Sequence, residues 1–325
     1  MPTKSIPITD EQSWLENRLL DITSTEVSAL YDLSPYQTEF ELYHQKKEKH
    51  VVRLEENERM TWGKRLEDSI AHGAAETMGW DIEKFDVYMS NPKTRMGSSF
   101  DYKINKTESM AGMPMYGGAG ILEIKNVDGV AYRKNWKDDG NGNIEAPEHI
   151  ELQIQHQMEV ADMGWCALVA LVGGNTQKIV FRKRDRAIGE DLTKKVGAFW
   201  EKVKAGTPPN IDYLIDADYI IKTLHNQADP GVILNADEDL DRLIDEYNIT
   251  NRELHSLSKT KDSLKAQILE RSEKASKIVS KYGTISCGMS KESKGKLITQ
   301  EMVGTYQSPR KGYRMFRFTS TPSTN

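Results

Sequence analysis

The chain has 325 residues, of which 29% are charged, 38% hydrophobic and 8% aromatic, and its formal net charge is −5. These values are those of an ordinary folded protein and exclude an intrinsically disordered one. The acidic balance argues against indiscriminate nucleic-acid binding. Basic residues nevertheless gather in two places, residues 178–186 and 302–325.

The cysteine content and the hydropathy of the sequence indicate the cellular compartment of the protein. The two cysteines, Cys166 and Cys287, are too few for a disulfide framework, a four-cysteine metal site or an iron–sulfur site. We recognise no apolar run long enough to span a bilayer and no secretory signal at the N-terminus. We therefore expect a cytoplasmic protein that does not act at a membrane.

From residue 13 to residue 209 the sequence alternates between helical and strand patterns, after a loose terminus at residues 1–12. Helices are predicted over residues 16–30, 38–49, 61–78, 147–163 and 185–204, with Thr61 as the cap and Gly79 as the stop of the third. Strands are predicted over residues 85–89, 97–105, 120–127, 165–172 and 176–182, the last two as a hairpin. Helices packed on a mixed central sheet make this an α/β (α+β) domain.

The pattern changes after Pro209. Residues 236–247 and 251–282 are charge-rich helical stretches with sparse apolar positions, typical of a coiled coil or a bundle helix. Residues 283–318 are predicted to form a small β-hairpin in which aromatic residues interleave with basic ones, including Arg314 and Arg317. Such a stripe can stack bases and neutralise phosphates, or it can be an edge strand with one packed face. We thus divide the chain into residues 1–12, 13–209 and 210–325.

The strand predicted at residues 120–127 carries the most informative motif, Glu123-Ile124-Lys125. Side chains alternate along a strand, so Glu123 and Lys125 share one face, between apolar neighbours that make their burial costly without partners. Asp101 lies where the preceding strand can deliver a second carboxylate. This set can hold a divalent cation against a phosphate and thus indicates metal-dependent phosphodiester cleavage. By itself, Glu-x-Lys more commonly forms a solvated cross-strand pair.

Two helices offer further polar groups. Glu67 shares a helix face with Gly63 and Ala71, whose small side chains leave it room to reach the sheet; alternatively it forms a surface ion pair with a basic neighbour. Gln153 and Gln157 share a face of a later helix. They can hold water or phosphate, or they can border the buried face of that helix.

Near the start of the chain, Arg18 precedes the hydroxyl-rich run Ile22-Thr23-Ser24-Thr25. An arginine beside hydroxyls and free backbone N–H groups suits a terminal phosphate. The alternative is a capping box formed by Thr23 and Glu26.

In this order the motifs resemble those of the YqaJ-type viral recombinases, a family of the PD-(D/E)xK nuclease superfamily that includes the phage lambda exonuclease. The resemblance covers residues 13–205. It is carried by Trp14, Arg18, residues 22–25, residues 34–36, Trp62-Gly63-Lys64-Arg65-Leu66-Glu67, Asp101, Glu123-Ile124-Lys125 and residues 152–155.

The resemblance implies a PD-(D/E)xK core whose metal ligands are Asp101, Glu123 and the carbonyl of Ile124. The metal would be Mg²⁺, with Mn²⁺ as a possible substitute. Lys125 would position or deprotonate the attacking water. Glu67 would support the metal shell.

The same resemblance gives Gln153 a place near the water, and it gives Arg18 and Thr25 a place in a pocket for a 5′ phosphate. Two positions depart from the family pattern. Thr25 stands where serine is commoner, and Asp101 follows Ser-Ser-Phe instead of the usual lead-in. A methionine-rich insert at residues 105–118 is predicted to be a hairpin tip with packed methionines, or else a lid or wedge over DNA.

The implied function is a metal-dependent DNA exonuclease that digests linear double-stranded DNA from 5′ to 3′ in the bacterial host cytoplasm. It would leave 3′ single strands for a single-strand annealing protein in phage-type recombination. The family also implies a ring-like homo-oligomer, often a trimer. Two alternatives are a structure-selective endonuclease on the same fold and a non-catalytic DNA-binding or assembly protein. A Cas4-like nuclease is disfavoured because its four cysteine ligands are missing.

Overall fold

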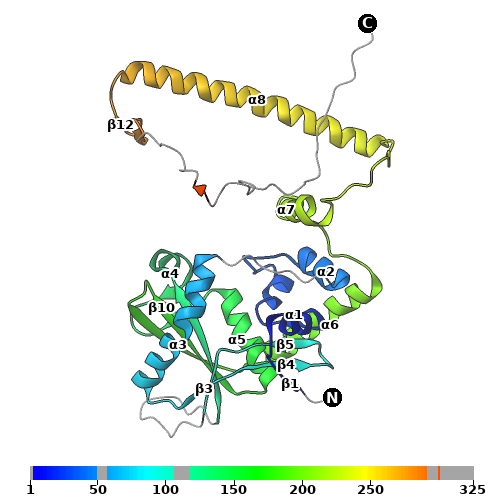
Figure 1. Ribbon diagram of the computed structural model, residues 1–325, viewed down its shortest axis with the longest axis vertical. Coiled ribbons are helices and arrows are strands. Elements are labelled where there is room, and N and C mark those ends of the chain that lie inside the picture. Colours follow the sequence, from blue (N-terminus) through cyan, green and yellow to red (C-terminus); the bar gives the residue numbers. More distant parts are fainter. Residues whose placement is uncertain (1–2, 50–56, 106–117, 291–298, 301–325) are drawn as a thin grey trace. The chain divides into compact units, whose positions relative to one another are not determined.

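The computed structural model describes residues 3–49, 57–105, 118–290 and 299–300. The chain divides into two compact units, Met1–Ile220 and Ile221–Asn325. Figure 1 labels helices and strands of both units. Within the described ranges, no helix combines the length and the apolar character needed to cross a membrane.

Two sheets form the first unit. The larger has the strand order β11-β10-β7-β6-β3, and it is mixed because β7 and β10 run parallel while the other neighbours run antiparallel. The smaller has the order β1-β4-β5-β2. The strands are β1 (Lys4–Pro7), β2 (Ile22–Thr23), β3 (Ile82–Lys84), β4 (Val87–Asn91), β5 (Met96–Ser98), β6 (Tyr102–Ile104), β7 (Gly120–Val127), β10 (Trp165–Val172) and β11 (Thr176–Lys183). The predicted mixed α/β class is confirmed.

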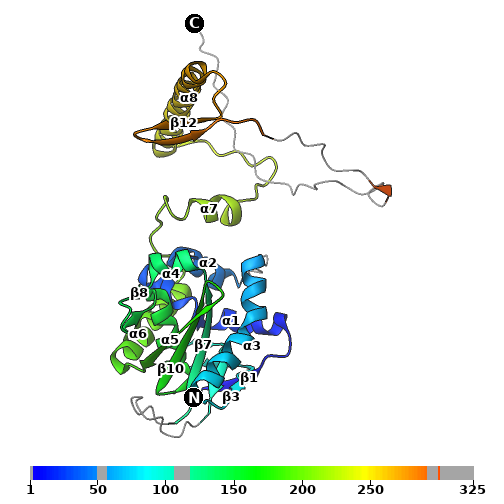
Figure 2. The same ribbon diagram turned by 90° about the vertical axis from the view of Figure 1, so that its left-hand side faces the viewer.

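Helices cover both faces of β7, and the alternation of its side chains decides which face meets which helix. Leu122 and Ile124 join Ala71 and its neighbours on α3 (Glu58–Met78) in one core cluster. Ile121, on the opposite face, packs with Ile154 of α5 (Glu148–Ala161) in another. Figure 2 shows the two helices on opposite sides of β7.

Further helices and a small hairpin complete this unit. They are α1 (Glu11–Leu20), the 3-10 helix η1 (Val27–Tyr31), α2 (Glu39–Glu48), α4 (Gly129–Asn135), α6 (Arg186–Ala205), α7 (Ala217–Tyr219) and the small hairpin of β8 (Lys137–Asp138) with β9 (Ile144–Glu145). The start of β7 is held close to β10 by a glycine. A Cβ at Gly120 would lie 2.3 Å from Cε2 of Trp165, so only glycine fits beneath that ring.

Three predicted boundaries were wrong for tertiary reasons. The helix predicted over residues 16–30 ends at Leu20, because Ile22 and Thr23 pair with β5 instead. The single strand predicted over residues 97–105 is two strands, β5 and β6, which belong to different sheets. Helix α3 begins at Glu58, three residues earlier than predicted, because the side chain of Asn57 rather than Thr61 caps it.

The second unit contains η2 (Ile220–Leu224, of which Ile220 belongs to the first unit), α8 (Glu238–Ser272) and a hairpin of β12 (Lys277–Ser280) with β13 (Gly283–Ser286). Helix α8 is one continuous helix where the sequence predicted two stretches, and it ends ten residues before the predicted end at residue 282. The hairpin at Lys277–Ser286 therefore lies earlier than the one predicted over residues 283–318. Most of that basic and aromatic tail lies outside the described residues.

Candidate active site

The candidate active site lies at an open edge of β7. Strand β6 pairs with β7 only from Ile104↔Gly120 to Tyr102↔Leu122, whereas β10 accompanies β7 as far as Val127. Extending the β6 register by one pair sets Asp101 directly opposite Glu123. The Asp101 carboxylate occupies the place of the missing strand, since its Oδ2 accepts a hydrogen bond of 2.7 Å from the backbone N–H of Ile124.

Glu123 is buried and held by three donors. Its Oε1 accepts hydrogen bonds from Lys125 Nζ at 2.5 Å and from Gln153 Nε2 at 2.6 Å. Its Oε2 accepts one from Gln157 Nε2 at 2.7 Å. The two glutamines lie one helical turn apart on α5 and so reach the same carboxylate. These bonds offset the cost of burying the carboxylate and fix the orientation of Glu123.

The ammonium of Lys125 is firmly charged. Burial alone would lower the pKa of Lys125, but the carboxylates of Glu123 and Asp101 outweigh it and raise that pKa above its ordinary value. A quarter of the side-chain surface remains exposed (25%), so part of the Lys125 side chain is in contact with solvent. A lysine in this state supplies positive charge and hydrogen bonds, and it does not accept a proton at neutral pH.

Asp101 is strained electrostatically. Burial raises its pKa well above the ordinary value, and repulsion by the neighbouring Glu123 raises it further. A cation between the two carboxylates would relieve this repulsion. Both N–H and C=O of a residue point to the same side of a strand, so the Ile124 carbonyl faces the same open edge.

This donor set fits a magnesium ion. Two carboxylates, a backbone carbonyl and waters are the oxygen ligands that Mg²⁺ prefers. No group of three or more His, Cys, Asp or Glu side chains gathers for a metal anywhere in the described ranges. The site therefore depends on two acids and the backbone rather than on an acidic cage.

Glu67 approaches this edge from the other face of the sheet. It is half-buried on α3, and burial raises its pKa, with Lys84 opposing and Glu123 among the carboxylates that add to the effect. Glu67 thus lies within electrostatic reach of the site, and no hydrogen bond joins it to Asp101 or Glu123 among the contacts described. It can act on the site only through charge or through a bridging water.

Arg18 and Thr25 also come together. Arg18 Nη2 donates to Oγ1 of both Thr23 and Thr25 at 3.3 Å, and its guanidinium stacks over the Trp14 ring at 4.7 Å. Glu26 completes half of the alternative capping box, since its Oε2 accepts the Thr23 N–H at 2.9 Å. Both interpretations of this segment therefore describe real contacts.

A serine links this cluster to the catalytic strand. The Trp14 indole N–H donates to Ser99 Oγ at 2.8 Å, and the Ser99 carbonyl accepts from Gln157 Nε2 at 3.4 Å. Ser99 stands two residues before Asp101. The sequence predicted no role for Ser99, and it did not place Gln157 among the catalytic residues. The spacing of four residues between Gln153 and Gln157 was nevertheless a usable signal.

The sequence has two concentrations of basic residues, of which only the C-terminal one, with Arg314 and Arg317, was predicted to contact DNA. Arg314 and Arg317 lie outside the described residues. In the basic run at residues 178–186, Lys178, Arg182 and Arg184 each form an ion pair with an acidic side chain. Those three charges are therefore engaged within the fold.

The comparisons with known proteins agree with the resemblance seen in the sequence. Residues 13–164 match the family model described as YqaJ-like viral recombinase domain. The uncharacterized protein YqaJ of Bacillus subtilis (strain 168) is 24% identical over 261 residues, which cover 78% of this chain and 76% of that protein. The predicted resemblance is confirmed for residues 13–164, which match the model of the YqaJ-like viral recombinase domain.

Two solved structures found by the comparison come from bacteria. An alkaline exonuclease (LHK-Exo) from Laribacter hongkongensis is 19% identical with a TM-score of 0.45, covering 60% of this chain and 94% of that one. A phage related exonuclease from Haemophilus somnus 129PT is 12% identical with a TM-score of 0.36, covering 58% of this chain and 96% of that one.

Proposed function

We propose that this protein is a divalent-metal-dependent deoxyribonuclease that digests linear duplex DNA from the 5′ end. The convergence of Asp101, Glu123 and Lys125 at the open edge of β7 is the observation that supports this most directly. Two acids and a charged amine at one solvent-accessible edge suit the hydrolysis of a phosphodiester. The product would be a 3′ single strand for an annealing protein in phage-type recombination.

Each residue has a distinct part in this proposal. Asp101, Glu123 and the Ile124 carbonyl would hold the metal. When bound, such an ion polarises the phosphate and lowers the pKa of a water. Lys125, charged through its carboxylate neighbours, orients the water and stabilises the negative charge that grows on the phosphate oxygens. Gln153 and Gln157 fix Glu123 in the ligating orientation, while Glu67 adds negative charge at the border of the site.

A 5′ phosphate is the group that we assign to Arg18 and Thr25. The guanidinium and the hydroxyl lie within hydrogen-bonding distance of each other, so one phosphate can contact both. Trp14, on which the Arg18 guanidinium stacks, donates to Ser99 two residues before Asp101, and this contact supports a phosphate pocket close to the proposed metal site.

Digestion of end-labelled linear duplex tests the proposal. We expect Mg²⁺-dependent release of nucleotides from the 5′ end, abolished by a chelator. Glu123→Gln and Lys125→Ala should each lower the rate by at least about 10²-fold, the loss typical for a group that stabilises transition-state charge. Undiminished digestion by both variants in a nuclease-free preparation would contradict the assignment. A 5′-hydroxyl duplex tests the Arg18 pocket and should be a poorer substrate.

The two alternatives give different results in the same assay. An exonuclease leaves closed circular DNA intact, whereas a structure-selective endonuclease converts it to nicked or linear forms. A non-catalytic assembly protein would bind DNA without metal-dependent product. The charged state of Lys125 and the three donors on Glu123 favour a functioning site over a degenerate one.

We also propose that the protein self-associates, with a trimer as the form that the family suggests. Helix α8 carries apolar side chains that are more than half exposed at Leu243, Leu254, Leu257 and Leu264. Their spacings of 11, 3 and 7 residues follow the a and d positions of one heptad register. A second copy of α8 would cover this stripe, by the same knobs-into-holes packing as in coiled coils.

A further inference from the structure

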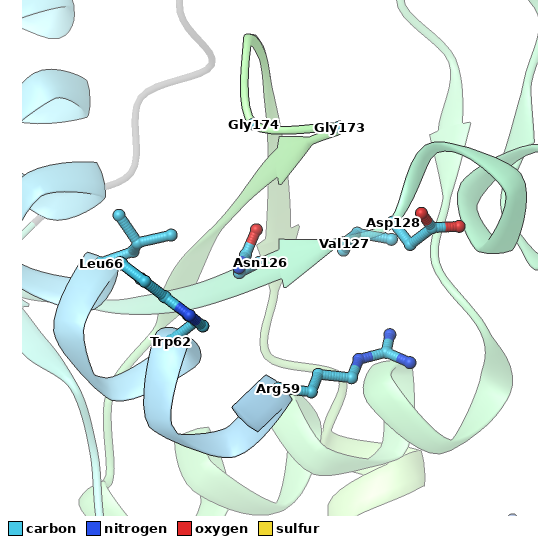
Figure 3. A pocket seen from close by; sticks show the side chains of 8 residues that line it. All are labelled: Arg59, Trp62, Leu66, Asn126, Val127, Asp128, Gly173 and Gly174. Atoms are coloured by element: carbon cyan, nitrogen blue, oxygen red, sulfur yellow. The ribbon is translucent and has the colours of Figure 1, made fainter. Parts of the chain in front are cut away.

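A pocket of 420 Å³ opens where the catalytic strand ends. Arg59, Trp62 and Leu66, from the first turns of α3, form one side, and Asn126 of β7 forms another. The turn Gly173–Gly174 between β10 and β11 closes it (Figure 3). Its volume lies within the range of sites that bind small molecules, about 300–1,000 Å³.

The pocket is one residue away from the proposed chemistry. Asn126 directly follows Lys125, and its backbone belongs to the same stretch of β7 that β6 leaves unpaired. Glu67, on the border of the site, lies one residue beyond the pocket residue Leu66 on α3. Side chains alternate along β7, so Asn126 faces α3 whereas Glu123 and Lys125 face α5, and the pocket and the Asp101–Glu123–Lys125 site border the same unpaired edge from opposite faces. A DNA strand whose phosphate lies at that edge can extend a base into the pocket.

The lining suits a nucleobase better than a phosphate. Trp62 offers an aromatic surface that is half exposed, at 50%, and Leu66 adds apolar contact. The Asn126 amide can both donate to and accept from the edge of a base. Arg59 and Asp128 bring opposite charges to the lining, so the pocket offers a phosphate no net positive charge.

We infer that this pocket is a nucleobase-binding subsite, in which Trp62 stacks on one of the two bases that flank the scissile phosphate. The inference rests on the proposed function in taking DNA as the substrate. Stacking explains why a large aromatic side chain stands exposed at the first turns of α3, where a solvent-facing position ordinarily carries a polar residue. Because every base has a π face, the subsite would hold the strand without selecting its sequence.

A structural role for Trp62 is the competing explanation. The Arg65 guanidinium lies 5.2 Å from the centre of the Trp62 ring, so the pair could simply stabilise the start of α3. The two explanations differ in one respect: only a base-binding role makes the effect of Trp62 depend on the presence of a base.

Equilibrium binding provides the test. The probe is a DNA hairpin with one open end and a 5′-phosphorylated overhang of two nucleotides, measured by anisotropy in Ca²⁺ to prevent digestion. Matched hairpins carry an abasic residue at the first or the second overhang position. Wild type is compared with Trp62→Ala, with Trp62→Phe, and with Tyr213→Ala, which removes an exposed aromatic residue outside the pocket.

Trp62→Ala should bind the intact probe about tenfold more weakly, a loss within the range for one stacked base. Trp62→Phe should recover most of the affinity, and Tyr213→Ala should match wild type. One of the abasic probes should bind wild type and Trp62→Ala equally. The inference is overturned if Trp62→Ala binds the intact probe like wild type, or loses the same factor on every probe.

Thermal unfolding of Trp62→Ala is measured in parallel, and Trp62→Phe keeps the test valid if the alanine variant is unstable. The result is separate from the proposed activity. A protein that binds in this base-dependent way but digests nothing in Mg²⁺ would retain the subsite and lose the nuclease assignment. A nuclease whose Trp62→Ala variant binds the intact probe like wild type would retain the nuclease assignment and lose the subsite.

Discussion

At the scale of single residues, Glu123 shows how hydrogen bonds offset the free-energy cost of burying a carboxylate in this site. A buried carboxylate is expensive, and three donors offset that cost at Glu123. Burial raises the pKa of Asp101, and the like charge of Glu123 raises it further against a single backbone donor. Hydrogen bonds within the fold thus stabilise the Glu123 carboxylate, whereas a bound cation would be needed to relieve the repulsion at Asp101.

Gln157 should be a positioning residue. Gln157→Leu removes the donor to Glu123 Oε2, so we expect the rate of digestion to fall by about 10- to 100-fold, as for partners that orient metal ligands. Unfolding should change little in comparison. Gln155 is the matched control on the same helix, since it bonds the Lys183 carbonyl and the Asp185 N–H instead.

Gln155→Leu leaves those backbone groups unpaired and should lower the free energy of unfolding by about 1–3 kcal/mol. Digestion at a temperature where both variants are folded distinguishes the roles. Equal activity losses in the two variants would show that the whole helix, rather than the contact with Glu123, matters.

His156 should make the stability of the core pH-dependent. Burial lowers its pKa to about 4, with Glu26 opposing. The folded state therefore resists protonation that the unfolded chain accepts below about pH 6.5. The stability that the neutral His156 contributes is present above that pH. As the pH falls toward 4, the free energy of unfolding decreases by about 3 kcal/mol because of this group.

Chemical denaturation of wild type and His156→Gln between pH 7 and pH 4.5 checks this prediction. The difference in free energy of unfolding between the two proteins should shrink as the pH falls. Comparing the two proteins cancels the raised pKa values of Asp101 and Glu67, which act in the opposite direction. A constant difference across this range would contradict a neutral, buried imidazole.

At the scale of elements, the site exists because β6 is short. Strand β6 ends its pairing at Tyr102, and the chain before it turns away to β5 in the other sheet. This break exposes the polar edge of β7 from Glu123 onward and sets Asp101 against it. Helices α3 and α5 then approach the edge from opposite faces, with Glu67 on one and the two glutamines on the other.

Helix α8 should determine the oligomeric state. Leu254→Glu combined with Leu257→Glu places charges in the apolar stripe, and we expect the molar mass in solution to fall to that of the monomer by light scattering. Ser256→Glu adds charge to the same helix off the stripe and is the matched control. An unchanged mass for the double variant would mean that another surface holds the copies together.

At the scale of the whole molecule, the two units have different sources of stability. The first has three clusters of buried apolar residues, whereas α8 contains no buried residue. A helix of 35 residues without a packed face gains little from tertiary contacts. The first unit should therefore fold without the second.

A chain ending after Leu224 tests this division. It retains the contact of Thr38 Oγ1 with Asp216 Oδ1 at 2.6 Å, which joins α2 to the segment before α7. We expect its melting temperature to lie within a few degrees of that of the full chain and its digestion of short duplexes to persist. Loss of cooperative unfolding would show that the second unit is needed for the fold.

Much of this architecture was predictable from the sequence because its signals are local. The apolar alternation around Glu123, the helix stop at Gly79 and the hairpin of β10 with β11 depend on neighbours along the chain. The same holds for the ordered motifs of residues 13–164, whose resemblance to the YqaJ-like viral recombinase domain rests on side-chain identity. A regular period is visible in one dimension, and these features need nothing more.

Only the tertiary structure decided how the polar groups meet. The sequence predicted that the preceding strand brings Asp101 to Glu123, but the register that sets the two opposite each other depends on where β6 stops. No local pattern joins Gln157 and Ser99 in the same network. Likewise, local helical pattern could not reveal that Ile22 and Thr23 pair with β5. Hydrogen bonds between distant segments are set by the packing of whole elements, and their free energies enter only when those elements are in place.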